Sequence, residues 1–223
     1  MLQYPANEPC EDRFNCHQFK NFNGFYAAVF DGHGGWQVSE YAMRKMHIFL
    51  DEELKNAKTE KEIKQAMLNA FDRVEQDWVK LAKDAFNMGY PKVAYVGSCA
   101  LVAIVKDNKL YVANAGDSKG ALLRKKADGT YEYVKVSETF NANKKKEQDR
   151  LKKEFPKEED IVKCKRNDNK ACYVKGNLMP TRALGDLRLK FAEFNFHNYP
   201  PDQGYRVPIP TFNGPYITHK PEI

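Results

Sequence analysis

The chain has 223 residues, of which 42% are hydrophobic and 13% aromatic, so it is long and apolar enough for a single domain with a buried core. No run approaches the roughly 18 apolar residues of a membrane-spanning helix, and a membrane protein is therefore not expected. The net charge of +6 is modest, and its basic excess lies in residues 144–175, where acidic residues are interleaved. Mixed charge runs of this kind are typical of solvated helices and loops, so we expect no nucleic-acid partner.

The cysteines do not suggest a disulfide framework. The chain has five, an odd number, and none of them forms a C-x-x-C pair. They stand at positions 10, 16, 99, 164 and 172. We therefore expect reduced thiols and an intracellular protein.

The first predicted elements form a hairpin. Residues 13–18 and 24–30 are strand-like runs joined by an asparagine-rich link, and their pairing would bring Glu11 and Asp12 toward Asp31. Adjacent glutamate and aspartate residues are common on protein surfaces, so this pair alone means little. Next to Asp31, it has the geometry that a shared metal site needs.

The segment GFYAAVFDGHGG, at residues 24–35, predicts a buried strand that runs into a glycine-rich turn. Asp31 and His33 stand at its end among three glycines, which allow the backbone to approach whatever the acid holds. We therefore expect this segment to hold a metal ion. The alternative is a tight strand-to-helix corner, but turn geometry does not explain His33. The segment matches neither a P-loop, nor a dinucleotide loop, nor a calcium loop.

Two helices follow, at residues 36–54 and 59–86, and the second begins at a capping box formed by Thr59 and Glu62. The apolar stripe of the second helix predicts a set of buried side chains, namely Ile63, Met67, Phe71, Val74, Trp78, Leu81 and Ala85. A stripe of this spacing indicates packing on a sheet.

The remaining chain is rich in short strands. Residues 96–106, 109–113 and 119–125 predict an antiparallel meander, followed by a strand at 131–136. A polar helix is expected at 143–154, where Pro156 ends it. The last predicted features are a strand pair at 161–164 and 171–175 around a polar loop at 165–170, and an irregular proline-rich segment from 187 to 223.

Four motifs in this order resemble the protein phosphatase 2C family of metal-dependent serine/threonine phosphatases. They are VFDGHGG at 29–35, GSCALVAIV at 97–105, NAGDSKGALL at 114–123 and LMPTRALGD at 178–186. The resemblance implies an α+β fold, a β-sandwich of two antiparallel sheets flanked by helices. It implies one phosphatase 2C-like domain over residues 1–223 that is incomplete at its C-terminal end.

Three further stretches are most similar to the pyruvate dehydrogenase phosphatases of that family. They are YPANEPCEDR at 4–13, RLKKEFP at 150–156 and PYITHKPEI at 215–223. This narrower resemblance implies a mitochondrial matrix location; otherwise we expect a cytoplasmic one. In either case the implied partner is a phosphorylated protein substrate.

The family resemblance also implies the site residues. Asp31 is expected to bridge two Mg²⁺ or Mn²⁺ ions, with the Gly32 carbonyl as a further ligand. Glu11 is expected to contact metal through water, as is Asp12. His33 is the expected general acid, which protonates the leaving serine or threonine oxygen; its alternative role is a hydrogen bond within the turn. A water shared by two metals is the expected nucleophile.

The sequence also departs from the family pattern. Asn7 stands where the family usually has the arginine that binds substrate phosphate. Thr139 and Phe140 stand where it has an Asp-His pair, so the sequence lacks the aspartate that the family uses at a third metal site. The later metal-binding aspartates of the family have no counterpart before Ile223. A second hypothesis is therefore an inactive phosphatase-like binding or regulatory module, or a fragment. A third is an unrelated metal-binding sandwich.

Asp117 lies in the third motif, where we interpret it as a turn residue that shapes the sheet. We therefore leave it out of the expected ligands.

Overall fold

The computed structural model describes residues 4–5, 7–165, 168–195, 208–209 and 211–223. Its centre is a five-stranded antiparallel sheet with the order β1-β2-β3-β4, to which β9 adds by pairing with β3. The strands are β1 (Arg13–Gln18), β2 (Phe25–His33), β3 (Gly97–Lys106), β4 (Lys109–Ala115) and β9 (Leu184–Gly185). Residues 166–167 of the expected polar loop, and 196–207 and 210 of the expected irregular segment, lie outside the described residues.

The predicted hairpin is confirmed. β1 and β2 are antiparallel, and Arg13 pairs with Phe30 while Gln18 pairs with Phe25. β2 alternates between the helix-covered face and the open face, so Tyr26, Ala28 and Phe30 are buried and the residues between them are not. The strand therefore reaches its last residues with a fixed register.

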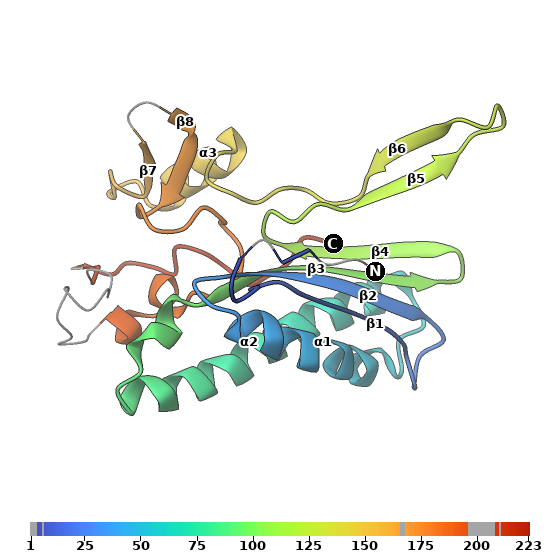
Figure 1. Cartoon of the computed structure of the whole chain (residues 1–223), viewed down its shortest axis with the longest axis horizontal. Helices are drawn as coiled ribbons and strands as arrows, with labels where there is room; N and C mark the ends of the chain where they lie inside the picture. The colour runs from blue at the N-terminus through green and yellow to red at the C-terminus, as the bar shows by residue number, and fades with distance from the viewer. Residues whose placement is uncertain (1–3, 6, 166–167, 196–207, 210) are drawn as a thin grey trace.

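Two helices cover one face of this sheet: α1 (Gln37–Leu54) and α2 (Glu60–Asn87) (Figure 1). The capping box at Thr59 and Glu62 is confirmed. Leu81, expected in the buried stripe of α2, is 50% exposed, and the neighbouring Ala82 is buried in its place. Over 28 residues the 3.6-residue period drifts, so the buried face shifts by one position near the end of the helix.

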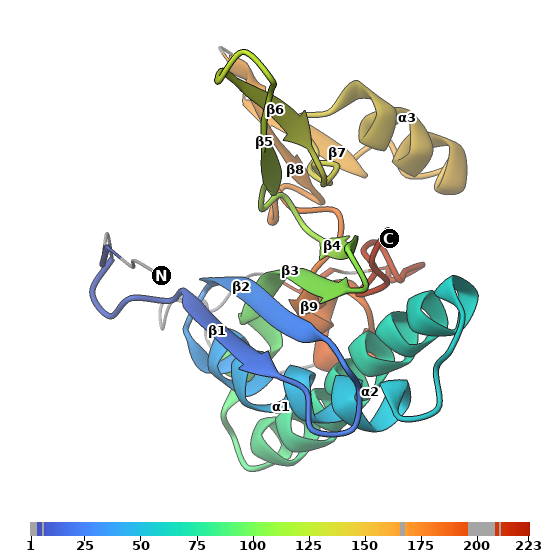
Figure 2. The ribbon, with the colours of Figure 1, turned by 90° about the vertical axis from the view of Figure 1, so that its right-hand side faces the viewer.

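The other face of the sheet carries two hairpins and a short helix (Figure 2). They are β5 (Ala121–Lys125) with β6 (Tyr131–Lys135), β7 (Val162–Lys165) with β8 (Asp168–Val174), and α3 (Lys145–Glu154). The predicted meander was wrong at its third strand, because β5 pairs with β6 in a separate sheet. Asn114 explains the break: its Nδ2 donates to the carbonyls of Gly116 and Ser118, which holds this link as an open loop and not a tight turn.

A second apolar cluster lies under the β7-β8 hairpin and includes Leu151, Ile161, Val174 and Tyr216. The expectation of reduced cysteines was wrong for two of the five, since Cys164 and Cys172 are joined by a disulfide. They are directly opposite each other in the β7-β8 register, and this cross-strand position is not visible from sequence spacing alone.

Three short 3₁₀ helices complete the described elements: η1 (Pro91–Tyr95), η2 (Leu187–Leu189) and η3 (Ala192–Asn195). None of the helices in the described part of the chain is long and apolar enough to cross a membrane. The mixture of helices and antiparallel sheets confirms the predicted α+β class.

Candidate active site

The end of β2 places Asp31, Gly32 and His33 opposite Cys99, Ser98 and Gly97 of β3. Gly32 is buried against the backbone of Glu11, where a Cβ atom would lie 2.2 Å from the Glu11 carbonyl oxygen. A larger residue at this position would therefore push the Glu11 segment away. The glycine is needed for close approach and not for turn geometry.

Glu11 and Asp12 lie beside the end of β2, as the hairpin register requires. The hydroxyl of Ser39 in α1 donates to the Glu11 carbonyl at 2.5 Å and so ties this segment to the start of the helix. Desolvation and then the charges of Asp12 and Asp117 raise the pKa of Asp31, and Glu11 adds to the effect. Burial is the largest cause, and the neighbouring carboxylates add negative charge that a bound cation would offset.

Asp117, which sequence reasoning left out, faces Asp31 in the structure. One ligand atom from each of Asp31, Cys99 and Asp117 lies within 4.8 Å of the others. Asn141 Nδ2 donates to Asp117 at 3.0 Å, and the Cys99 thiol lies 3.4 Å from the other carboxylate oxygen. Burial, followed by the charge of Asp117, raises the pKa of the Cys99 thiol well above its usual value.

His33 contacts a buried carboxylate that sequence reasoning also missed. Its Nε2 lies 2.7 Å from Asp186 Oδ2, and Asp186 is 4% exposed. Burial lowers the pKa of His33, but the charge and hydrogen bond of Asp186, followed by the charges of Asp31 and Asp117, raise it more, so the net shift is upward. The arrangement therefore favours an imidazolium that Asp186 orients.

Gly97 makes the contact between His33 and Asp186 possible. A Cβ atom on Gly97 would lie 2.0 Å from Asp186 Oδ2 and 2.4 Å from His33 Nε2. Asp186 itself has a positive φ of 50°, which aims its side chain at the histidine from the opposite side of β3. Gly97 and Asp186 each lie in one of the motifs that resemble the family, at 97–105 and 178–186, but only the fold brings the two residues together.

The loop that carries Asp186 is anchored from below by α2. Glu75 accepts hydrogen bonds from the Gly185 backbone at 2.9 Å and from Lys190 Nζ at 2.5 Å. The Glu75 and Lys190 side chains are each 3% exposed, so this ion pair is out of solvent. The Asp186 backbone N–H also donates to Val96 at 2.8 Å. Asp186 is thus presented by a rigid loop.

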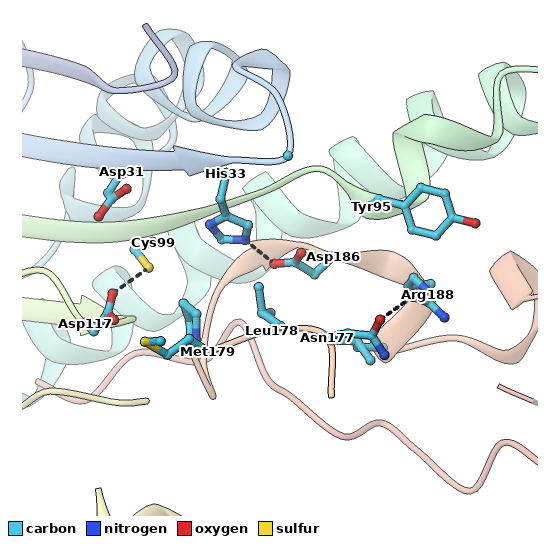
Figure 3. A pocket seen from close by; sticks show the side chains of 13 residues that line it. Asp31, His33, Tyr95, Cys99, Asp117, Asn177, Leu178, Met179, Asp186 and Arg188 are labelled. Atoms are coloured by element: carbon cyan, nitrogen blue, oxygen red, sulfur yellow. Dashed lines mark hydrogen bonds and ion pairs between the residues drawn. The ribbon is translucent and has the colours of Figure 1, made fainter. Parts of the chain in front are cut away.

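One pocket of about 330 Å³ is lined by Asp31, His33, Cys99, Asp117 and Asp186 (Figure 3). Asp31, Cys99 and Asp117 form one end of it, and His33 and Asp186 lie further along. The remaining wall comes from η1, from the turn after β8 and from η2, with Tyr95, Asn177 and Arg188 among its side chains. The pocket therefore contains a group of acidic residues at one end, the His33–Asp186 pair, and an arginine.

The donor set at the acidic end fits a hard cation. Asp31, with Glu11, Asp12 and Asp117 nearby, offers carboxylate oxygens, and the backbone of Gly32 offers a carbonyl. Such ligands suit Mg²⁺ or Mn²⁺ better than softer metals.

The departures from the family pattern are visible as well. Phe140 is 3% exposed, and the Arg182 guanidinium lies 4.1 Å from the centre of its ring. Phe140 is therefore a packing residue, and neither it nor Thr139 offers a carboxylate. Asn7 is exposed.

The chain is similar in sequence to known protein phosphatases. "Probable protein phosphatase 2C 64" of Arabidopsis thaliana is 32% identical over 201 residues, which cover 90% of this chain and 48% of that protein. Pyruvate dehydrogenase phosphatase 1, mitochondrial, of Bos taurus is 28% identical over 293 residues, covering 99% of this chain and 53% of that protein. The chain spans about half the length of the curated relatives that it matches.

A solved structure confirms the fold. The serine-threonine phosphatase 2C from Toxoplasma gondii superposes with a TM-score of 0.66 at 16% identity, covering 95% of this chain and 67% of that one. The family model "Protein phosphatase 2C" matches residues 6–223. The chain belongs to the protein phosphatase 2C family.

Proposed function

We propose that this chain carries the active site of a metal-dependent protein phosphatase that hydrolyses phosphoserine and phosphothreonine. One observation carries the proposal: His33, paired with the buried Asp186, shares a pocket with the acidic group around Asp31. Phosphoester hydrolysis needs a nucleophile at one side of the phosphoryl group and a proton donor at the other. The pocket offers residues for both tasks.

In this proposal Asp31, the Gly32 carbonyl, Glu11 and Asp12 hold two Mg²⁺ or Mn²⁺ ions. The chemistry that such ions supply is activation of a water and neutralisation of charge on the phosphoryl group. Asp117, which lies against Asp31, adds negative charge to the same end of the pocket. The four carboxylates also repel a bare phosphate, so substrate binding depends on the cations.

His33 is the proton donor in the proposal. Its Nε2 is committed to Asp186, and its other nitrogen, Nδ1, is on the side of the ring toward Asp31 (Figure 3). A proton held there is available to the leaving serine or threonine oxygen, because the pKa of His33 is raised and the imidazolium persists toward neutral pH. Asp186 keeps the ring oriented while the proton moves.

The relatives guide the substrate proposal. The bovine relative's name states that it acts on pyruvate dehydrogenase in mitochondria, and it aligns with 99% of this chain. We propose a phosphorylated protein as substrate and an intracellular location, the mitochondrial matrix if the substrate is of that type.

A second candidate is a phosphatase-like module that binds phosphorylated protein without turnover. Thr139 and the buried Phe140 stand where the family has an Asp-His pair, and this departure favours the second candidate.

The test compares wild type with His33→Gln on two substrates in the presence of Mn²⁺. A phosphoserine peptide has a poor leaving group that needs protonation, whereas p-nitrophenyl phosphate has a good one that does not. The proposal expects His33→Gln to lose about a hundredfold or more in rate on the peptide and far less on the aryl phosphate. Equal losses on both would refute the proton-donor role, and binding of the peptide without phosphate release would favour the module.

A further inference from the structure

The β7-β8 hairpin stands apart from the central sheet and is closed by the disulfide between Cys164 and Cys172 (Figure 2). β7 has four residues, and its register with β8 shifts directly after Cys164. A two-stranded hairpin by itself is only marginally stable in water. A cross-link between the strands restrains the loosened states of the hairpin, so the disulfide decides how firmly β7 holds β8.

The two cysteines differ in their access to solvent. Cys164 is exposed, whereas Cys172 is buried in the second apolar cluster with 0% of its surface accessible. A reductant can therefore approach the disulfide from the side of Cys164. The bond that would break joins an exposed sulfur to a buried one.

The buried end of the disulfide is linked to the wall of the pocket. The backbone N–H of Cys172 donates to Asn143 Oδ1 at 2.8 Å, and Asn143 Nδ2 lies 3.3 Å from Met179 Sδ. The backbone N–H of Val174 also donates to the Leu178 carbonyl at 2.7 Å. Leu178 and Met179 both line the pocket (Figure 3). β8 therefore holds this wall from behind at two points.

The segment that carries Asn143 reaches the acidic end of the pocket as well. Asn141 Nδ2 donates to Asp117 at 3.0 Å, and the backbone N–H of Ala142 donates to the Met179 carbonyl at 2.8 Å. Residues 141–143 thus lie between the hairpin and two parts of the pocket. If β8 loosens at Cys172, Asn143 loses its backbone partner, and the hold on Met179 and Asp117 weakens.

We propose that the disulfide between Cys164 and Cys172 is a redox switch for the pocket: the oxidised hairpin fixes the wall at 177–180 for the phosphorylated substrate, and reduction by a dithiol releases it. The effect on substrate rests on the proposed function. In the cytosol, glutathione and thioredoxin keep most thiols reduced, and the disulfides found there are usually transient, catalytic or redox-sensing. With the intracellular location that we propose, a reducible disulfide behind the pocket wall suits regulation.

The exchange reaction needs only a dithiol. One of its thiolates forms a bond to the Cys164 sulfur, and the electron pair of the S–S bond leaves on the Cys172 sulfur, which takes up a proton. The second thiolate of the reductant then attacks its own sulfur in the mixed disulfide and releases Cys164, which is protonated in turn. The dithiol becomes a disulfide, and its two electrons and two protons end on the protein cysteines.

The first test needs neither substrate nor metal. Amide hydrogen exchange is followed by mass spectrometry in the metal-free chain, once oxidised and once reduced with dithiothreitol. Peptides from 141–144 and 172–181 should exchange about fivefold or more faster after reduction, whereas those from β2 and α2 should not change.

The second test measures binding. A fluorescently labelled peptide carries a non-hydrolysable phosphonate in place of phosphoserine, and its dissociation constant is measured by fluorescence anisotropy with Mn²⁺ present. Reduced protein is first transferred to a thiol-free buffer under nitrogen. The oxidised chain should bind the peptide about fivefold or more tightly than the reduced chain. Because such coupling is reciprocal, the peptide should make the disulfide harder to reduce by the same factor.

Cysteine variants assign the response to this disulfide. Cys164→Ser cannot form the bond and leaves the buried Cys172 in place, so it should behave like reduced wild type with or without dithiothreitol. Cys16→Ser is the matched control, because Cys16 is an exposed free cysteine on β1. It should keep the full redox response. Circular dichroism checks that both variants are folded.

Three results would overturn the inference: equal exchange at 141–144 and 172–181 in oxidised and reduced wild type, equal peptide binding by the two forms, or a redox response that persists in Cys164→Ser. If neither form binds the peptide, the proposed function fails. Hydrogen exchange then decides by itself whether the disulfide controls the wall of the pocket.

Discussion

Replacing Asp186 by asparagine removes the negative charge that faces His33 and keeps the size of the side chain. The joined atoms are 2.7 Å apart, and the side chains of His33 and Asp186 are 24% and 6% exposed. A hydrogen bond between charged groups contributes about 1.5 to 3 kcal/mol to stability. We expect Asp186→Asn to lower the free energy of unfolding by an amount in this range when His33 is protonated.

The pH dependence of that loss follows from the raised pKa of His33. A histidine whose pKa is higher in the folded state stabilises the fold below its ordinary pKa, and this contribution is lost as the pH rises through the raised value. The variant should therefore be weaker than wild type by the full amount at about pH 6 and by much less at about pH 9.

Urea denaturation at both pH values, with a chelator and no added metal, measures the difference. Asp84→Asn is the matched control, because Asp84 is exposed on α2 and lies outside the pocket. Equal stability of Asp186→Asn and wild type near pH 6 would refute the reasoning. So would a loss of the same size at both pH values, since it would point to packing and not to charge.

Two further substitutions test how the loop of Asp186 is held. Gly97→Ala places a Cβ atom 2.0 Å from Asp186 and 2.4 Å from His33, so we expect it to separate the pair and to cost about 1 to 3 kcal/mol of stability, measured by urea denaturation. Glu75→Gln leaves Lys190 as a buried charge without its partner carboxylate, and thermal and urea denaturation should show a loss of about 3 to 5 kcal/mol.

Each of these has a control in the same chain. Gly120→Ala meets its nearest neighbour atom at 3.0 Å and should be tolerated much better than Gly97→Ala. Glu60→Gln breaks an exposed ion pair with Lys109 and should leave stability nearly unchanged. If Gly97→Ala lost no more stability than Gly120→Ala, the inference that Gly97 is needed for close packing around His33 would be refuted. If Glu75→Gln lost no more stability than Glu60→Gln, the inference that α2 anchors the loop would be refuted.

The part of the fold that follows local periodicity could be predicted from the sequence. The alternation in β2, the capping box of α2 and the two-residue link between β3 and β4 are local signals, and each appears where expected. The third strand of the meander could not be predicted, because the side chain of Asn114 holds the following loop through carbonyls as far away as Glu138. The disulfide was missed for a related reason: spacing does not reveal that Cys164 and Cys172 share one register position.

The site residues also fall into those that local sequence signals bring together and those that only the fold brings together. The grouping of Glu11, Asp12 and Asp31 follows from one hairpin register, so sequence reasoning could place these residues near one another. Asp186 is 153 positions from His33, and Asp117 enters the pocket from the loop after β4. Both aspartates lie in the motifs that resemble the family, at 114–123 and 178–186. The sequence alone does not show where their side chains point or which residues they contact.

The measurement that tests the central claim most directly is Mn²⁺- and Mg²⁺-dependent release of phosphate from a phosphothreonine peptide by the purified chain, with Asp31→Asn beside it. The account predicts release that requires the metal and is lost in Asp31→Asn, while circular dichroism shows both proteins folded. Release that is unaffected by Asp31→Asn, or no release from the folded wild-type chain at any metal concentration, would contradict it.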